Sequence, residues 1–461
     1  MSSPQAYPAF PHVGRLFGTD GIRGVAGEFP MDRRTAYALG VALGERLTVM
    51  GREAEVVLGM DTRESGPWLA AHVAGGLRRA GARVRFAGIV STPAIAFLTR
   101  RQGFAAGVVV SASHNPYRDN GIKIFGPSGY KLADDEEAFI EQRVFALLER
   151  DLQPESAELQ VETGLAETYA DFLAASLPYV LDGLRLAVDC AHGAASVLAP
   201  RLFERLGARV SAIGCAPDGR NINQGCGALD VEPLRAHVLA QSADLGVAFD
   251  GDADRAIFVT GDGRVVDGDG VLWLAGLWLH ERGRLKGNAG PTIVATVMSN
   301  LGLEKALAER GIRLVRTAVG DKYVLEEMLR CGAVLGGEQS GHVIFLEYAT
   351  TGDGLLTALR VLEIVQDRGR SLRELTQELR LYPQKLVNVP VRERRPFEQL
   401  PSVLNAIREA ELKLGARGRI FVRYSGTELL ARVMVEGEDP ALVSALAAQV
   451  AAALREELGR H

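Results

Sequence analysis

Three aspartates alternate in the stretch DGDADR, which directly follows the apolar run LGVAF. Asp250, Asp252 and Asp254 stand at positions i, i+2 and i+4, and in an extended segment such side chains point to the same side. Without a cation, the three carboxylates repel one another and raise each other's pKa values. A divalent cation removes this conflict, and a few oxygen ligands with room left for phosphate suit Mg²⁺. The spacing therefore predicts a magnesium site.

DGDADR has two other interpretations. A calcium-binding EF-hand loop needs glycine at its sixth position and glutamate at its twelfth, where this chain has Arg255 and Gly261. An acidic surface turn is the second alternative, and the buried strand expected before the loop disfavours it. We interpret the stretch as a metal site.

A serine and a histidine follow another apolar run in the stretch GVVVSASHNP. The run GVVV predicts a buried strand, and Pro116 keeps Asn115 out of the helical region. Ser113 and His114 are therefore expected on a tight loop at the carboxyl end of a strand, where ligands bind in open α/β sheets. No GxSxG motif surrounds Ser113, so a hydrolase is disfavoured, while a capped turn stays open on this stretch alone.

Two lysines come soon after this loop, in NGIKIFGPSGYKL. Lys123 and Lys131 are close in sequence to Ser113. A lysine beside a developing phosphate charge can stabilise that charge or move a proton. Their proximity favours a functional loop over a simple turn.

Two more glycine-bearing loops carry polar groups. GGEQSGH offers Glu338, Ser340 and His342, which suit a ligand rich in hydroxyls, and a glycine turn is an equal alternative. RYSGTE combines a guanidinium, two hydroxyls and a glycine amide, which suit a phosphate, and a surface turn is the alternative. The residues of this second loop are Arg423, Ser425, Gly426 and Thr427.

These loops must be positioned by short apolar strands that alternate with helical stretches. Polar loops with glycine follow the strands in EVVLGMDTRESG, LRLAVDCAHGAAS, DLGVAFDGDADR and AVLGGEQSGH. This plan predicts doubly wound α/β domains. Residues 380–398, rich in proline and charge, are predicted to be a linker, and RIFVRYSGTELLARVMVEGE between two helices predicts a small α+β unit.

Composition limits the function classes. The length of 461 residues predicts several domains, and the hydrophobic fraction of 47% allows sizeable cores. Acidic residues outnumber basic ones by 57 to 52, and without a dense basic block this disfavours nucleic acid as a partner. The four cysteines form no CxxC pair, so neither a disulfide framework nor a zinc site is predicted.

The apolar runs are too short to span a membrane, and the first fourteen residues lack the features of a signal peptide. We therefore expect a cytoplasmic protein with a flexible N-terminal tail. No GxxxxGK[ST] motif occurs, which disfavours a kinase of that type.

Five motifs in this order, LFGTDGIRG, SASHNP, DGDADR, GGEQSGH and RYSGTE, resemble those of the α-D-phosphohexomutase family. The resemblance covers the chain from about Gly14 onward. Within the family, FGTDGIRG, GEQSGH and the following TTGDG are most similar to phosphoglucosamine mutases. The alternative branch is that of the phosphomannomutases/phosphoglucomutases. A phosphatase stays an alternative, because attack on the phosphoserine by water instead of a sugar gives hydrolysis. A non-catalytic sugar-phosphate sensor is a more distant alternative, because the serine and all three aspartates are present.

The resemblance implies three α/β domains with mixed sheets and a smaller C-terminal α+β domain, arranged around a central cleft. We expect a flexible tail at 1–14, a domain with the serine loop at 15–168, one with the metal loop at 169–266, one with the sugar loop at 267–384 and one with the phosphate loop at 385–461.

The resemblance also implies an isomerase that works as an intramolecular phosphotransferase. Phosphorylated Ser113 gives its phosphoryl group to glucosamine 6-phosphate and takes back the other phosphate of glucosamine 1,6-bisphosphate, leaving glucosamine 1-phosphate. The bisphosphate is expected to serve also as an activator, and the product to supply UDP-N-acetylglucosamine and peptidoglycan precursor synthesis. The partners implied are a small phosphosugar, no nucleic acid and no membrane, with a homodimer as the candidate assembly.

Site residues are carried over by their motif positions. One Mg²⁺ per subunit is held by a phosphate oxygen on Ser113 and by Asp250, Asp252 and Asp254. The catalytic group is Ser113, the proton-transfer lysine Lys123, His114, Arg23, Arg255 and His342. Sugar hydroxyls are bound by Glu338 and Ser340, and the phosphate that is not reacting by Arg423, Ser425, Gly426 and Thr427. One departure is Leu429, where the family commonly has a proline that would fix φ, so we expect a slightly looser loop.

Overall fold

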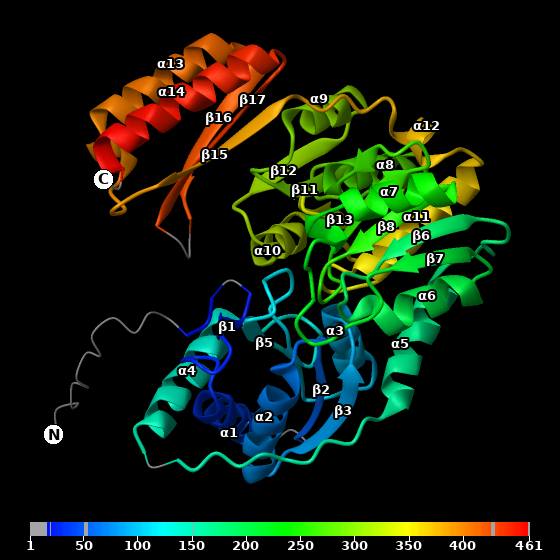
Figure 1. Ribbon diagram of the computed structural model, residues 1–461, viewed down its shortest axis with the longest axis vertical. Helices are drawn as coiled ribbons and strands as arrows, with labels where there is room; N and C mark the ends of the chain where they lie inside the picture. The colour runs from blue at the N-terminus through cyan, green and yellow to red at the C-terminus, as the bar shows by residue number, and fades with distance from the viewer. Residues whose placement is uncertain (1–15, 19, 50–53, 151, 426–428, 460–461) are drawn as a thin grey trace. The chain divides into compact units, whose positions relative to one another are not determined.

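The computed structural model describes residues 16–18, 20–49, 54–150, 152–425 and 429–459 (Figure 1). These residues form two compact units. One comprises the described residues up to Val297 together with Val315–Thr376, and the other comprises Met298–Leu314 together with those from Gln377 onward. The predicted N-terminal tail lies outside the described residues. Within the described ranges, no helix is both long and apolar enough to cross a membrane.

The first sheet has the strand order β1-β5-β4-β2-β3. Strand β2 runs parallel to β3 and β4, whereas β5 runs antiparallel to β4 and β1. The strands are β1 (Ile22–Val25), β2 (Glu55–Met60), β3 (Arg83–Ile89), β4 (Ala106–Val110) and β5 (Asp119–Phe125). The helices are α1 (Arg33–Val49), α2 (Gly66–Arg79), α3 (Thr92–Arg101) and α4 (Asp134–Leu148).

Burial on both faces explains why the strands of this sheet are continuous apolar runs. Every residue of β4 is buried. Val108 and Val110 pack in one core with side chains of α1, α2 and α4. On the other face Gly107 lies against α3, where a Cβ at Gly107 would stand 2.0 Å from Thr99 Oγ1. Sheets covered on both faces carry such strands.

The second sheet has the order β10-β9-β8-β6-β7 and is also mixed. Strand β6 runs parallel to β7 and β8, and β9 runs antiparallel to β8 and β10. The strands are β6 (Arg185–Asp189), β7 (Arg209–Ile213), β8 (Leu245–Phe249), β9 (Ala256–Thr260) and β10 (Val265–Val266). The helices are α5 (Thr163–Ser176), which precedes β6, α6 (Ala195–Arg205) and α7 (Glu232–Gln241).

The third sheet has the order β12-β11-β13-β14, with β11 parallel to β13 and β13 antiparallel to β14. The strands are β11 (Thr292–Thr296), β12 (Arg313–Thr317), β13 (Leu335–Gly337) and β14 (Val343–Phe345). The helices are α8 (Gly268–Glu281), α9 (Leu301–Glu309), α10 (Asp321–Cys331), α11 (Gly354–Arg368) and α12 (Leu372–Thr376).

The last sheet has three antiparallel strands in the order β15-β17-β16, and α13 and α14 lie along one face of it (Figure 1). Its elements are β15 (Gln384–Pro390), α13 (Pro401–Leu414), β16 (Gly418–Tyr424), β17 (Leu430–Gly437) and α14 (Pro440–Leu458). The predicted linker is wrong over β15, because that stretch pairs with β17 along its whole length. Pro390 is tolerated because β15 is an edge strand and the proline is its last residue.

The predicted fold class is confirmed as three α/β domains with mixed sheets and a smaller C-terminal α+β domain. The domain boundaries and the central cleft stay predictions.

Candidate active site

Ser113 lies on the loop that joins β4 to β5, at the carboxyl end of a buried strand, as the sequence predicts. The residue is 1% exposed and adopts a left-handed backbone conformation with φ of 52°. Its Oγ donates a hydrogen bond to Asp250 Oδ2 at 2.6 Å and lies 3.3 Å from His114 Nδ1. The serine loop therefore meets the aspartate loop directly.

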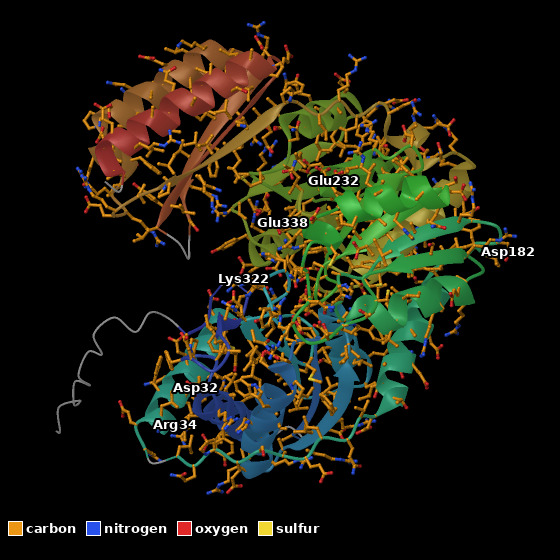
Figure 2. All side chains as sticks on the ribbon, in the orientation of Figure 1. Asp32, Arg34, Asp182, Glu232, Lys322 and Glu338 are labelled. Carbon is orange, nitrogen blue, oxygen red and sulfur yellow. The ribbon has the colours of Figure 1, made fainter. Side chains whose placement is uncertain are left out.

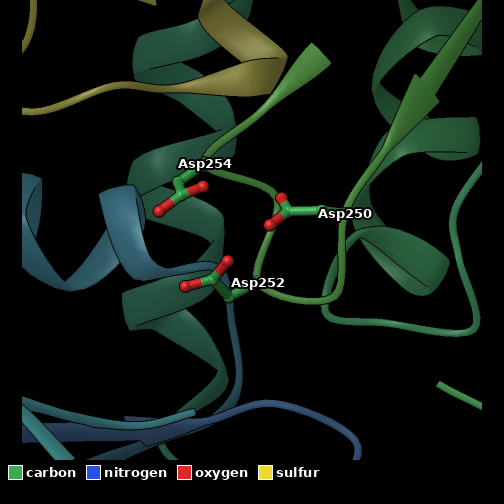
Figure 3. Close-up of side chains that lie close together, drawn as sticks. All are labelled: Asp250, Asp252 and Asp254. Carbon is green, nitrogen blue, oxygen red and sulfur yellow. The ribbon is translucent and has the colours of Figure 1, made fainter. Parts of the chain in front are cut away.

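The three aspartates lie on the loop between the antiparallel strands β8 and β9, and their carboxylates converge (Figure 3). One oxygen of each lies within 4.8 Å of the others. An extended segment was predicted here, and that detail is wrong. The chain turns at this point, with Ala253 left-handed at a φ of 57°, and the turn brings the side chains together.

This carboxylate cluster fits a divalent cation. All three aspartates are buried, and burial together with the charges of Asp254 and Asp252 raises the pKa of Asp250 well above its ordinary value. Within the described residues, the Oδ1 atoms of Asp252 and Asp254 are buried and have no hydrogen-bond partner. Buried carboxylate oxygens without partners are costly, and a hard cation satisfies them.

Lys123 projects from β5 into the same cluster and is 1% exposed. Its Nζ lies 2.9 Å from Asp252 Oδ2, 3.0 Å from Asp20 Oδ2 and 3.5 Å from Asp254 Oδ2. Burial opposes the charge, but the three carboxylates outweigh it and hold the pKa of Lys123 well above its ordinary value. Lys123 is therefore an ammonium within the aspartate cluster that contacts the serine loop.

Asp20, just before β1, is a site residue that the sequence reasoning did not single out. It accepts hydrogen bonds from Arg23 and from Lys131, in addition to its ion pair with Lys123. Burial raises the pKa of Asp20, but Lys123, Lys131 and Arg23 together bring it well below the ordinary value. Its position in the quoted motif LFGTDGIRG was the available signal.

Thr92 was also missed. It begins α3, and its Oγ1 donates to Asp252 Oδ2 at 2.5 Å. Its backbone N–H donates to the carbonyl of Asp252 at 3.0 Å. The strand-and-loop stretch VRFAGIVSTP, which ends just after this residue, carried the signal.

Two arginines leave donors free near the serine loop. Arg23 Nη1 donates to Asn115 Oδ1 at 3.1 Å, and the Arg255 backbone N–H donates to Asp250 Oδ1 at 3.2 Å. Both Nε atoms are buried and lack a hydrogen-bond partner among the described residues. Burial, followed by the charges of Arg255 and Arg23, lowers the pKa of His114 to about 3, so its imidazole is neutral. Free guanidinium N–H groups are suited to a phosphate.

Glu338, labelled in Figure 2, lies on the tight loop between the antiparallel strands β13 and β14. Its Oε1 accepts a hydrogen bond from the Gly320 N–H at 3.1 Å, and its Oε2 accepts one from Ser340 Oγ at 3.4 Å. The carboxylate is therefore held in place by one backbone group and one hydroxyl.

His342 ends the same loop and is 3% exposed. Its Nδ1 lies 3.6 Å from Asp254 Oδ1, and its Nε2 accepts a hydrogen bond from the Gly352 N–H at 3.1 Å. Gly352 belongs to the stretch TTGDG, which thereby orients the histidine toward the aspartate loop.

Contacts within the first compact unit thus connect most of the predicted residues. The connected residues are Arg23, Ser113, His114, Lys123, Asp250, Asp252, Asp254, Arg255 and His342. Glu338 and Ser340 form a hydrogen-bonded pair in the same unit.

The predicted phosphate loop lies in the second compact unit. Arg423 on β16 stands directly opposite Arg432 on β17, and Arg432 Nη2 lies 3.4 Å from Ser425 Oγ. Burial and the charge of Arg432 lower the pKa of Arg423. Like charges opposite each other on a sheet repel, and an anion relieves that repulsion. Gly426 and Thr427 lie outside the described residues.

Family models cover nearly the whole chain. Those described as phosphoglucomutase/phosphomannomutase match residues 14–151 as α/β/α domain I, 167–263 as domain II, 267–382 as domain III and 386–453 as the C-terminal domain. The chain belongs to the phosphoglucomutase/phosphomannomutase family. The predicted resemblance and the predicted enzyme class, an intramolecular phosphotransferase, are confirmed.

Two curated members of this phosphoglucomutase/phosphomannomutase family show the degree of similarity. A protein of Solibacter usitatus named phosphoglucosamine mutase is 56% identical and aligns over 96% of this chain and 99% of its own length. One of Koribacter versatilis with the same name is 51% identical, over 97% of this chain and 98% of its own.

Solved structures share the phosphoglucomutase/phosphomannomutase fold. A phosphoglucomutase/phosphomannomutase family protein of Burkholderia thailandensis has a TM-score of 0.78 at 26% identity, covering 96% of this chain and 97% of its own. An N-acetylphosphoglucosamine mutase of Aspergillus fumigatus has a TM-score of 0.64 at 20% identity, covering 96% and 95%. The second likeness concerns the fold alone.

Proposed function

We propose that this chain interconverts glucosamine 6-phosphate and glucosamine 1-phosphate, through a phosphoserine at Ser113 and a glucosamine 1,6-bisphosphate intermediate. The observation that carries the proposal is the seating of the Ser113 hydroxyl against the buried aspartate cluster, 2.6 Å from Asp250 Oδ2. The choice of sugar is supported by relatives at 47–56% identity that are named phosphoglucosamine mutase.

Magnesium would be held by Asp250, Asp252 and Asp254 together with a phosphate oxygen on Ser113. When bound, the cation neutralises charge on the phosphoryl group that is transferred. Lys123 is kept as an ammonium by its carboxylate neighbours, so it stabilises charge on the transferred group and holds a proton close to it.

The remaining groups bind and orient the phosphosugar. The Nε–H groups of Arg23 and Arg255, which have no hydrogen-bond partner among the described residues, are available to the reacting phosphate, with Arg255 Nε also 3.8 Å from Asp254 Oδ1. Glu338 and Ser340 bind ring hydroxyls, and Arg423 and Ser425, with Gly426 and Thr427, hold the phosphate that is not reacting. In the first transfer the sugar oxygen attacks the phosphorus and the bond to Ser113 Oγ breaks. In the second transfer Ser113 Oγ attacks the phosphorus of the other phosphate of the bisphosphate. The bond from that phosphorus to its sugar oxygen breaks, which leaves glucosamine 1-phosphate and restores the phosphoserine.

The proposal extends to the activation, the location and the assembly of the enzyme. We propose that free glucosamine 1,6-bisphosphate activates the enzyme by phosphorylating Ser113, and that the enzyme acts in the cytoplasm as a homodimer. Adding the bisphosphate to dephosphorylated enzyme should remove the lag in turnover, and sedimentation should give twice the chain mass of 49.5 kDa.

The deciding experiment measures kcat/KM for the phosphates of glucosamine, glucose and mannose under one set of conditions. Glucosamine phosphate is expected to give the highest value. Glucose carries a hydroxyl at carbon two that can still donate a hydrogen bond, so kcat/KM for glucose phosphate should be lower. Mannose has that carbon inverted, so its phosphate should give the lowest kcat/KM. An optimum for glucose or mannose would assign the chain to the other branch of the family.

A further inference from the structure

Arg63, in the stretch DTRESG after β2, is a buried charged residue. It contacts the serine loop and not the aspartate cluster of the predicted metal site. It is 1% exposed, and arginine is buried only where its N–H groups have partners. Its Nε donates to Asp61 Oδ2 at 2.9 Å. The two Nη atoms donate to three backbone carbonyls, those of Ser113 at 2.8 Å, Asn115 at 2.9 Å and Pro116 at 2.6 Å.

Asp61 extends the same network to the other side of Ser113. Its Oδ2 accepts a hydrogen bond from Ser111 Oγ at 2.5 Å, and Ser111 Oγ in turn accepts one from the Ser113 N–H at 3.0 Å. Asp61 is fully buried, and its own N–H donates to the carbonyl of Val110, the last residue of β4. These contacts form a closed ring. Asp61 is linked through Ser111 to the N–H of Ser113, and the carbonyl of Ser113 is linked through Arg63 back to Asp61.

The conformation held by this ring is an uncommon one. Ser113 has a φ of 52°, and for a residue with a Cβ the left-handed region is less stable than the right-handed one. Such conformations persist only where the surroundings hold them, and they gather at functional sites. The ring supplies that restraint through both backbone groups of the residue.

The carbonyl of Ser113 also faces the aspartate loop. It accepts a second hydrogen bond from Asn223 Nδ2 at 3.0 Å, and a Cβ at Gly251 would lie only 2.6 Å from its oxygen. Gly251 follows Asp250, the residue that accepts the Ser113 hydroxyl. Shifting this carbonyl would therefore change the contact between the serine loop and the aspartate loop.

We propose that Asp61 and Arg63 are positioning residues that hold Ser113 in the left-handed conformation and so aim its Oγ at the aspartate cluster. The inference rests on the proposed function for the role of Ser113 as the phosphoryl carrier. Without the ring, Ser113 relaxes toward the right-handed region, with φ of about −60°. The Oγ then points away from Asp250, and transfer slows although substrate still binds.

The test uses the full-length enzyme with three substitutions. Arg63→Lys keeps the charge but loses the fork that spans three carbonyls, Arg63→Met removes both, and Ser111→Ala breaks the ring at one neutral hydroxyl. Each variant should lower kcat, and with it the rate at which glucosamine 1,6-bisphosphate phosphorylates Ser113. For the arginine variants we expect kcat to fall by about 100-fold, because a misplacement of the reacting Oγ by about 1 Å has an effect of that size. KM should change by less than about threefold.

A matched control separates positioning from stability. Arg360 is also buried, at 2% exposure, and bonds to the Ser176 carbonyl and the Tyr348 hydroxyl instead of the serine loop. Arg360→Lys should lower the melting temperature while leaving kcat per folded enzyme unchanged. If Arg63 has only a structural role, Arg63→Lys and Ser111→Ala should likewise lower the melting temperature and leave kcat per folded enzyme unchanged. That result would overturn the proposal.

Two further readouts keep the outcome decisive. If the Arg63 variants do not fold, Ser111→Ala alone decides, because it removes one neutral hydrogen-bonding group. A crystal structure of Ser111→Ala should show Ser113 with a negative φ, and an unchanged left-handed Ser113 would contradict the proposal. If instead the wild-type enzyme gains no phosphate on Ser113 when glucosamine 1,6-bisphosphate is added, the proposed function fails, while the φ of Ser113 in the variant still tests the ring.

Discussion

Lys123 Nζ lies 2.9 Å from Asp252 Oδ2, although the two residues are 129 positions apart in the chain. The ammonium comes from β5 of the first sheet, and the carboxylate from the loop after β8 of the second. Both side chains are almost completely buried, so water does not weaken the attraction between them. The pair links the serine-carrying part of the site to the part that fits a metal.

Replacing Lys123 by methionine should reduce kcat by a factor of about 10²–10⁴, as loss of a positioned proton-transfer or charge-stabilising group does. Because the variant leaves the buried carboxylates of Asp252 and Asp254 without their cation, we expect metal-free protein to lose about 3–5 kcal/mol of stability. Steady-state kinetics and urea unfolding measure the two effects. Lys286→Met, at an exposed lysine, is the control. A Lys123→Met enzyme with normal kcat would refute the catalytic role of Lys123.

Ser113→Ala should abolish the phosphoenzyme. Mass spectrometry of the wild-type protein should find a fraction heavier by one phosphoryl group, located in the peptide that contains SASHNP. The alanine variant should lose this label and at least about 10³-fold in turnover, because covalent catalysis needs the hydroxyl. Ser128→Ala, at an exposed turn nearby, should keep both. Full turnover by Ser113→Ala would end the phosphoserine mechanism.

Chelation should silence the enzyme, and added Mg²⁺ should restore it. Asp252→Asn should weaken Mg²⁺ binding by more than about tenfold, because the loss of a group that only supports the ligands already lowers the affinity of a metal site by about that factor. Calorimetric titration of the protein with Mg²⁺ measures this without any turnover. Asp262→Asn alters a partly exposed carboxylate outside the cluster and should bind Mg²⁺ normally. Equal affinities for the two variants would show that the cluster is not the metal site.

Arg423→Ala should raise KM by about 10- to 100-fold with a smaller change in kcat, because a charge-assisted contact to the phosphate is lost while the reacting groups stay intact. Released bisphosphate should become detectable. Arg417→Ala, on the exposed turn before β16, serves as the control. The assignment of Arg423 to the phosphate loop fails if KM is unchanged while the Ser113 label disappears.

Asp353 should make stability depend on pH. It caps α11, accepts the Tyr169 hydroxyl at 2.8 Å, and burial raises its pKa from 3.8 to about 6. The folded protein therefore keeps a proton that the unfolded chain has lost, so this contribution to stability is full below pH 3.8 and disappears as the pH rises through about 6.

Asp353→Asn removes this titration while keeping an amide oxygen for the cap. Relative to this variant, the wild-type free energy of unfolding should fall by about 2.4 kcal/mol between pH 4 and pH 7, at about 1.4 kcal/mol per pKa unit. Denaturant unfolding at a series of pH values measures the difference. Parallel curves for the two proteins would mean that Asp353 titrates normally.

The amino-acid sequence by itself determined the features that depend on short-range pattern. Apolar runs followed by glycine and polar residues placed Ser113 after β4, the aspartates after β8 and Glu338 after β13, because burial of a strand and reversal of the chain both leave local signals. The spacing of the three aspartates was enough to predict a cation site.

Only the tertiary structure decided which distant groups meet. Ser113 and Asp250 are 137 positions apart, and Arg63 reaches the serine loop from 50 positions away, so no local pattern could pair them. The predicted linker became β15 for the same reason, since strand pairing with β17 is a long-range contact. The aspartates converge through a turn instead of an extended segment, because contacts with Ser113 and Thr92 shape that loop. Local sequence fixes where strands and turns form, but packing between sheets chooses the partners of each buried charge.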